Sequence, residues 1–189
     1  WDWSSAGKLK DGKPYTTEDE FGKHDYMSIK GSMVWGRDVQ PEYHWFNGQM
    51  QYTTIDTRFD DSEGHIEINH INGSADDDQS RIWPFKRMKT IQPYDKGNKT
   101  MVIPHLFPKG KNDTTAYWKI YDWNKAIAFG MDYAGLPYSG EYDFVETDYV
   151  FPITHMVAPK ANVVGCTECH TAEQSRLANL AGFYMLGRD

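Results

Sequence analysis

Two cysteines and a histidine lie together near the carboxyl end of the sequence and carry its strongest chemical signal. Cys166 and Cys169 are separated by two residues, His170 follows directly, and the 189-residue chain has 2 cysteines in all. One helical turn places two thiols with this spacing on one face, and the next residue supplies an imidazole. The pattern is typical of haem c attachment, in which two thiols add across the porphyrin vinyl groups and the imidazole ligates the iron. We therefore predict one covalent haem c on Cys166, Cys169 and His170.

Two other readings of the cysteine pair stay open but fit the sequence less well. A zinc site needs four ligands, and the remaining histidines show no recognisable ligand spacing. A dithiol redox motif should open a helix after a strand in a βαβ unit, which the neighbouring sequence does not resemble. Since the chain has no further cysteine, a disulfide framework is excluded as the source of its stability.

The iron of the predicted haem has a second axial position, for which histidine and methionine are common ligands. The candidates are His24, His44, His65, His70, His105, His155 and Met185. We rank His155 first, because it lies in an apolar run shortly before Cys166, and His105 second. A histidine so close to the motif often serves a neighbouring haem, so His155 and His105 are predicted as iron ligands of this haem or another. Water or hydroxylamine is the alternative at a catalytic iron.

The remaining sequence must form the elements that position this motif. We expect a single unit with three parts: an extended arm over residues 1–31, a body over residues 32–165 and a haem-attachment tail over residues 166–189. The arm is polar and shows no sustained periodicity, so it is predicted to be loop-like.

Two stretches of the body predict regular structure. Residues 49–55 and 65–71 are rich in β-formers and predict a small antiparallel hairpin. From Asp122 to Ala134, apolar residues recur at helical spacing and Asp122 can cap the start of a helix. The predicted buried face of this helix comprises Trp123, Ala126, Ile127, Gly130 and Ala134.

The other stretches predict shorter structure. Prolines at 84, 93 and 104 argue against long elements over residues 81–105. Pro152 argues against a continuous helix near residue 150, whereas residues 171–180 predict a short amphipathic helix directly after the cysteine motif.

Composition narrows the class of protein. The hydrophobic share of 39%, with 15% aromatic residues, is enough to bury a core. A net charge of −7 with dispersed acidic residues argues against a nucleic-acid partner, and no run approaches the ~20 apolar residues needed to span a bilayer. The start at Trp1 resembles neither an initiator methionine nor a signal peptide, so either a leader was removed or, as we favour, upstream sequence lies outside this chain.

Several long runs resemble the carboxyl-terminal region of the octahaem tetrathionate reductase family of periplasmic multihaem cytochromes. The resemblance covers roughly residues 30–189 and rests on the runs 39–48, 81–86, 92–95, 98–100, 135–140, 154–160, 166–170 and 182–189. It implies a mainly α fold with irregular loops and a small β-hairpin, as a fragment of a multihaem cytochrome c scaffold related to hydroxylamine oxidoreductase and cytochrome c nitrite reductase.

The resemblance also implies a function. It points to a periplasmic or extracellular location and to electron delivery from periplasmic donors towards an active-site haem that reduces tetrathionate, nitrite or hydroxylamine. The family's active-site haem belongs to an upstream part that this chain lacks, so the carry-over is limited to the last haem, on Cys166, Cys169 and His170, and to His155 and His105 as distal ligands. The expected partners are the upstream haem-bearing part of the same protein or other cytochromes, and a homo-oligomer is a further expectation.

Two further hypotheses compete with this one. The chain is alternatively a self-contained monohaem electron-transfer protein with His155 or Met185 as the sixth ligand. It is otherwise a non-catalytic subunit whose aromatic surface docks onto other cytochromes.

Overall fold

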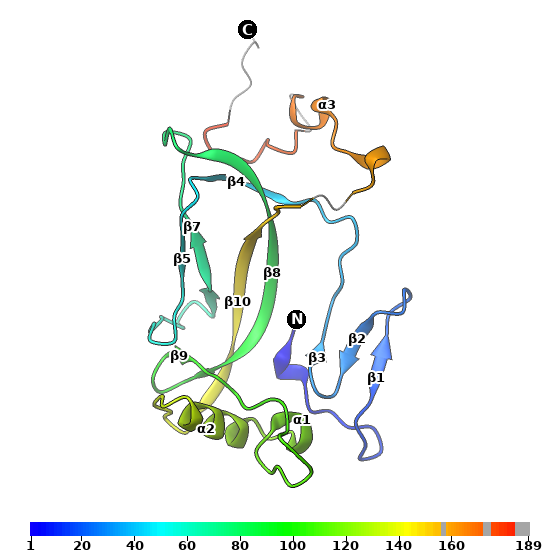
Figure 1. The fold of residues 1–189 in the computed structure, drawn as a ribbon, viewed down its shortest axis with the longest axis vertical. Coiled ribbons are helices and arrows are strands. Elements are labelled where there is room, and N and C mark those ends of the chain that lie inside the picture. Colours follow the sequence, from blue (N-terminus) through cyan, green and yellow to red (C-terminus); the bar gives the residue numbers. More distant parts are fainter. Residues whose placement is uncertain (156–157, 172–174, 184–189) are drawn as a thin grey trace. The chain divides into compact units, whose positions relative to one another are not determined.

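The computed structural model describes residues 1–155, 158–171 and 175–183 (Figure 1). Strands dominate these residues. The strands are β1 (Thr16–Glu18), β2 (His24–Met27), β3 (Gly31–Ser32), β4 (Glu42–Phe46), β5 (Met50–Tyr52), β6 (His65–Glu67), β7 (Asn69–Ile71), β8 (Arg81–Asp95), β9 (Thr100–Met101) and β10 (Tyr142–Pro152). The helices are α1 (Tyr117–Ile120), α2 (Trp123–Tyr133), α3 (Cys166–Cys169) and the 3-10 turns η1 (Trp3–Ser5) and η2 (Lys160–Asn162).

The predicted mainly α fold class is therefore wrong, because the described residues are mainly β. The error has a physical origin in β8, which runs for 15 residues through the proline-containing stretch where long elements were not expected. Proline removes only its own N–H donor, and Pro84 keeps a carbonyl that accepts a hydrogen bond from the Ile153 N–H at 2.9 Å. The expectation of helices also followed the multihaem resemblance rather than the β-forming residues of β10.

The chain divides into two compact units whose segments alternate along the sequence. The first unit comprises Trp1–Asp38, Thr53–Ile68 and Lys89–Asp148, and the second comprises Val39–Tyr52, Asn69–Met88 and Tyr149–Asp189. Neither unit coincides with the arm, body or tail expected from the sequence. That these residues form one unit of a larger protein stays a prediction.

The sequence predicted a loop-like amino-terminal arm, and this prediction is wrong for residues 16–32. They form the antiparallel sheet β1-β2-β3. The 3-10 turn η1 precedes this sheet, and the Asp2 carboxylate caps it by accepting a hydrogen bond from the Ser4 N–H at 2.9 Å.

The predicted helix is confirmed as α2, except that Ala134 is exposed and follows the last helical residue, while Met131 is buried in its place. This helix forms the main core of the first unit. Asp122 caps it by accepting a hydrogen bond from the Lys125 N–H at 3.0 Å. Its buried residues are Trp123, Ala126, Ile127, Gly130 and Met131. These pack with Tyr117, whose ring stacks on that of Trp123 with centroids 3.8 Å apart.

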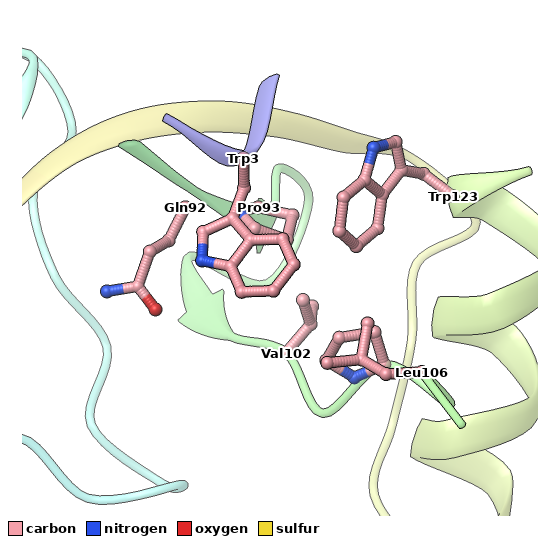
Figure 2. Close-up of a pocket in the computed structure, with 7 residues that line it drawn as sticks. Trp3, Gln92, Pro93, Val102, Leu106 and Trp123 are labelled. Atoms are coloured by element: carbon pink, nitrogen blue, oxygen red, sulfur yellow. The ribbon is translucent and has the colours of Figure 1, made fainter. Parts of the chain in front are cut away.

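A cavity of about 160 Å³ lies beside this core (Figure 2). Its lining comprises Trp3, Gln92, Pro93, Val102, Pro104, Leu106 and Trp123.

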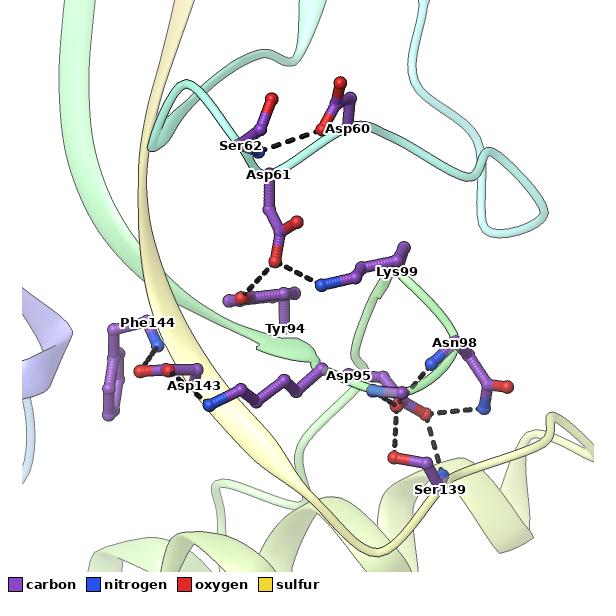
Figure 3. A network of polar contacts seen from close by, with 12 residues as sticks. Asp60, Asp61, Ser62, Tyr94, Asp95, Asn98, Lys99, Ser139, Asp143 and Phe144 are labelled. Atoms are coloured by element: carbon purple, nitrogen blue, oxygen red, sulfur yellow. Dashed lines mark hydrogen bonds and ion pairs between the residues drawn. The ribbon is translucent and has the colours of Figure 1, made fainter.

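A network of polar contacts links separate segments of the first unit (Figure 3). Asp61 accepts hydrogen bonds from the Tyr94 hydroxyl at 2.6 Å and from the Lys99 ammonium at 2.5 Å. Asp95 is fully buried and accepts hydrogen bonds from Ser139 and Asn98. These contacts tie the β8–β9 turn to neighbouring segments of the same unit.

In the second unit, β4 pairs antiparallel with residues 81–85 of β8, and β5 pairs antiparallel with β7. The β5–β7 pair confirms the predicted hairpin in part. The predicted strand over 65–71 is divided, however, because β6 pairs in parallel with β10 within the first unit. The second unit also contains α3, and thus the cysteine motif.

Candidate haem-attachment site

The cysteine motif forms α3, a single helical turn. Cys166 and His170 are exposed, Cys169 is half-buried, and the two cysteines are not joined in a disulfide. The chain enters the turn through Gly165 in an extended conformation, and the His170 N–H donates to the Cys166 carbonyl at 2.8 Å. A helix of four residues is not stable by itself, because nucleation costs more than one hydrogen bond returns. Contacts from elsewhere must therefore hold this turn.

Glu168 ties both ends of the turn together. Its Oε1 accepts a hydrogen bond from the Gly165 N–H at 2.9 Å, and its Oε2 accepts one from Arg176 Nε at 2.8 Å and a second, very short one from a terminal guanidinium nitrogen. The Gly165 N–H and then the guanidinium lower the pKa of Glu168. Glu168 is therefore ionised near neutral pH and forms a charge-assisted contact.

The segment after the motif returns to satisfy the open carbonyls of α3. The Ser175 hydroxyl donates to the Cys169 carbonyl at 2.7 Å, and the Arg176 N–H donates to the Glu168 carbonyl at 2.9 Å. Ser175 and Leu177 are buried. Carbonyls in the last turn of a helix lack partners within the helix, so these two contacts act as its carboxyl-terminal cap. The predicted helix over 171–180 is not formed by residues 175–180, which make turns, whereas residues 172–174 lie outside the described part.

Strand β4 also contacts the segment after the motif. Alternate residues of a strand share one face, so Tyr43 and Trp45 point the same way. The pKa of Arg176 is raised mainly by Glu168, with a smaller contribution from a hydrogen bond with Tyr43. Trp45 Nε1 donates to the Ala181 carbonyl at 2.8 Å, which joins residues 136 positions apart in the sequence.

Of the two distal histidines predicted from the sequence, His155 belongs to the same unit as the motif. It is exposed and follows the end of β10. Its role as an iron ligand stays a prediction.

His105 belongs to the first unit and is already engaged there. Its side chain is 12% exposed, its Nδ1 lies 3.0 Å from the Thr115 hydroxyl and its Nε2 lies 3.5 Å from the Asp113 carboxylate. The Nε2 contact is electrostatic, since its geometry does not make a hydrogen bond. The backbone N–H groups of Thr115 and Lys109 lower the pKa of Asp113, so the carboxylate stays charged beside the ring. Axial ligation through Nε2 would require His105 to leave this carboxylate, and it too stays a prediction.

Three other candidate histidines also lie beside carboxylates. The closest nitrogen–oxygen distances are 3.6 Å for His24 to Glu18, 3.2 Å for His44 to Glu42 and 3.5 Å for His65 to Asp148. Met185 lies outside the described residues. Within the described part of the chain, His, Cys, Asp and Glu side chains form no group of three that could hold a metal ion.

The donor set at α3 fits haem c. Two cysteines three residues apart on one helical turn and outside any disulfide suit attachment to the two vinyl groups, and exposure of Cys166 and His170 leaves room for a porphyrin beside them. Sequence reasoning found these three residues but missed the supporting ones, Arg176 and Tyr43. The only sequence signal for Tyr43 is its place in the run 39–48, and nothing in the sequence links Arg176 to Glu168.

Comparison with solved structures places this architecture among multihaem c-type cytochromes. The chain is similar over 100% of its length to an octahaem cytochrome c from Shewanella oneidensis, with a TM-score of 0.80 and 33% sequence identity. The match covers 42% of that chain, so this chain spans about two-fifths of its length. No curated protein matches the sequence.

The family model described as "Cytochrome c bacterial" matches residues 1–173. The chain therefore belongs to the bacterial cytochrome c family, and the predicted cofactor, covalent haem c, is confirmed. The multihaem part of the sequence resemblance is confirmed as well. Of the helices in the described part of the chain, none combines the length and apolar character needed to cross a bilayer.

Proposed function

We propose that this chain carries the last haem of a larger multihaem c-type cytochrome. In this proposal it passes electrons outside the cytoplasm towards a reductive active site held by the rest of the protein. One observation carries the proposal. The chain has a single cysteine motif, on α3, and it matches an octahaem cytochrome over 100% of its own length but over only 42% of that protein's length. The proposed reactions are the reduction of tetrathionate, nitrite or hydroxylamine, supported by the runs that resemble the tetrathionate reductase family.

The residues of α3 have separate tasks in this proposal. Cys166 and Cys169 would hold the haem through two thioether bonds, each made by addition of a thiol S–H across a vinyl group, so that no oxidant is needed. The His170 imidazole would bind the iron, and His155 and His105 would bind this iron or that of haems carried elsewhere. Haem iron supplies one-electron transfer at a potential that its axial ligands set. The chain's own part is to hold the thiols and the imidazole in register.

The attachment residues can be tested by mass. We expect the intact protein, matured in a host with a haem c assembly system, to gain the mass of one haem. Cys166→Ser with Cys169→Ser should abolish covalent haem, and Cys169→Ala alone should lower the covalent content and destabilise the holoprotein, because one thioether is lost. Thr167→Ala changes the motif without touching a donor and should keep full loading. Full covalent loading of the double cysteine variant would overturn the assignment.

A self-contained monohaem protein is the second candidate, favoured by the presence of one motif in the chain. A pyridine haemochrome assay and a low-spin spectrum of the isolated chain separate the two. His155→Ala should shift an isolated monohaem chain from low spin towards high spin. If His155 serves a neighbouring haem instead, the same substitution should change the spectrum only in the complete multihaem assembly. A subunit that only docks onto other cytochromes would lose partner binding, but no haem, when exposed aromatic residues are substituted.

A further inference from the structure

We infer that Arg176 is the positioning residue of the haem-bearing turn, which it holds between Glu168 and β4 so that the iron environment depends on it. The inference rests on the proposed attachment of haem to α3. Arg176 does not touch the thiols or the imidazole, so its effect must pass through Glu168 and the backbone of the turn.

Several contacts converge on Arg176. The guanidinium of Arg176 binds the Glu168 carboxylate through two nitrogens. The backbone N–H of Arg176 donates to the Glu168 carbonyl at 2.9 Å. It thus contacts both the side chain and the backbone of the residue directly before Cys169. A guanidinium presents a planar fork of donors that a lysine ammonium lacks, so a substitution to lysine does not reproduce this geometry.

The helical turn α3 has little other support among the described residues. Apart from the contacts of Glu168, the described hydrogen bonds to the turn are the Ser175 hydroxyl on the Cys169 carbonyl and the bond within the turn from His170 to Cys166. Cys166 and His170 are exposed, so side-chain packing does not fix them. Loss of Arg176 therefore removes a large share of what orders the backbone around His170.

Arg176 also links the helical turn α3 to strand β4. Trp45 of β4 donates a hydrogen bond to the Ala181 carbonyl at 2.8 Å, farther along the same tail, and Tyr43 on the same face of β4 interacts with Arg176 and helps to raise its pKa. The side chains of Arg176 and Glu168 are 25% and 41% exposed, so solvent partly screens their pairing and the expected effects are moderate.

The test uses the haem-loaded protein with Arg176→Gln and, as the matched control, Arg81→Gln. Arg81 is an exposed arginine of the same unit whose guanidinium donates, among the described residues, to the carbonyls of Asp78 and Ser80. We expect one covalent haem in both variants. In Arg176→Gln, amide hydrogen exchange at Glu168 and His170 should become about fivefold faster, and the reduction potential should shift from that of the parent protein. Arg81→Gln should change neither.

Two further variants test the same contact between Arg176 and Glu168 if Arg176→Gln folds poorly. Arg176→Lys should give an intermediate exchange rate, and Glu168→Gln should reproduce the effect of Arg176→Gln. Combining Glu168→Gln with Arg176→Gln should add little, since both act through one contact.

An unchanged exchange rate and potential in both Arg176→Gln and Glu168→Gln would overturn the inference. Equal changes in Arg81→Gln would do the same. Absence of covalent haem from the parent protein is a different result, which overturns the proposed attachment rather than the role of Arg176.

Discussion

Asp95 is the residue whose chemistry most clearly affects the stability of the first unit. Its carboxylate is 0% exposed and accepts hydrogen bonds from the backbone and side chains of both Ser139 and Asn98 (Figure 3). Burial alone would raise the pKa of Asp95, but the hydrogen bonds from Ser139 and Asn98 outweigh it and lower the pKa. A buried acid thus stays ionised because donors surround it.

We therefore expect Asp95→Asn to lower the free energy of unfolding by about 3 kcal/mol at pH 7, because an amide N–H₂ would face donors that lose their acceptor. The folded pKa of Asp95 lies below its unfolded value of about 3.9, so its stabilising effect is present above that value. It is lost as the pH falls through the folded pKa. Urea unfolding of both proteins at pH 7 and below pH 4 should show the difference shrinking in acid. The exposed Glu20→Gln serves as control, and an undiminished difference in acid would contradict the explanation.

Among the elements, α2 and the helical turn of α3 were predictable, whereas the contacts that hold α3 were not. The 3.6-residue spacing of Trp123, Ile127 and their neighbours reports burial of one face, and Asp122 is a local cap signal. Both can be read from adjacent residues. By contrast, α3 depends on Arg176 and on a strand over a hundred residues earlier, and no local pattern encodes such contacts. Sequence reasoning therefore located the thiols and the imidazole but not what holds them.

The strands were harder to predict for a related reason. Prolines in β8 argued for breaks, yet β8 pairs with β4 through Pro84, and the Pro84 carbonyl still accepts a hydrogen bond from the Ile153 N–H. The parallel pairing of β6 with β10 joins residues about 80 positions apart, and only the tertiary fold selects it. The hairpin prediction consequently assigned one strand to a segment that serves two sheets.

The close approach of α2 to the chain near His105 gives a prediction for this element. A Cβ at Gly130 would lie 1.9 Å from the Ile103 carbonyl oxygen and 2.9 Å from the His105 nitrogen. Alanine normally stabilises a helix by about 1 kcal/mol relative to glycine. Here we expect Gly130→Ala to destabilise the protein by about 2 kcal/mol, because backbone atoms must move.

Thermal or urea unfolding measures this change. Gly110→Ala is the matched control, since a Cβ at Gly110 meets nothing within 4 Å. If Gly130→Ala stabilised the protein, the packing of α2 described above would be wrong.

At the scale of the whole molecule, the two units share strands. Residues of β8 and of β10 belong to both units, and each unit is assembled from three separate segments of the chain. Melting of one unit would release strands that the other needs. We therefore expect urea unfolding followed by tryptophan fluorescence to coincide with unfolding followed by the haem absorbance, as a two-state transition requires. Two separated transitions would show that the units unfold independently.

The hydrogen bond from Trp45 to Ala181 sets an order of events during biosynthesis. The ribosome makes the donor 136 residues before the acceptor, so this contact forms only after Ala181 has been made. Until then the segment after the cysteine motif lacks this link to β4. A porphyrin attached before that moment would therefore meet a tail that this contact does not yet restrain.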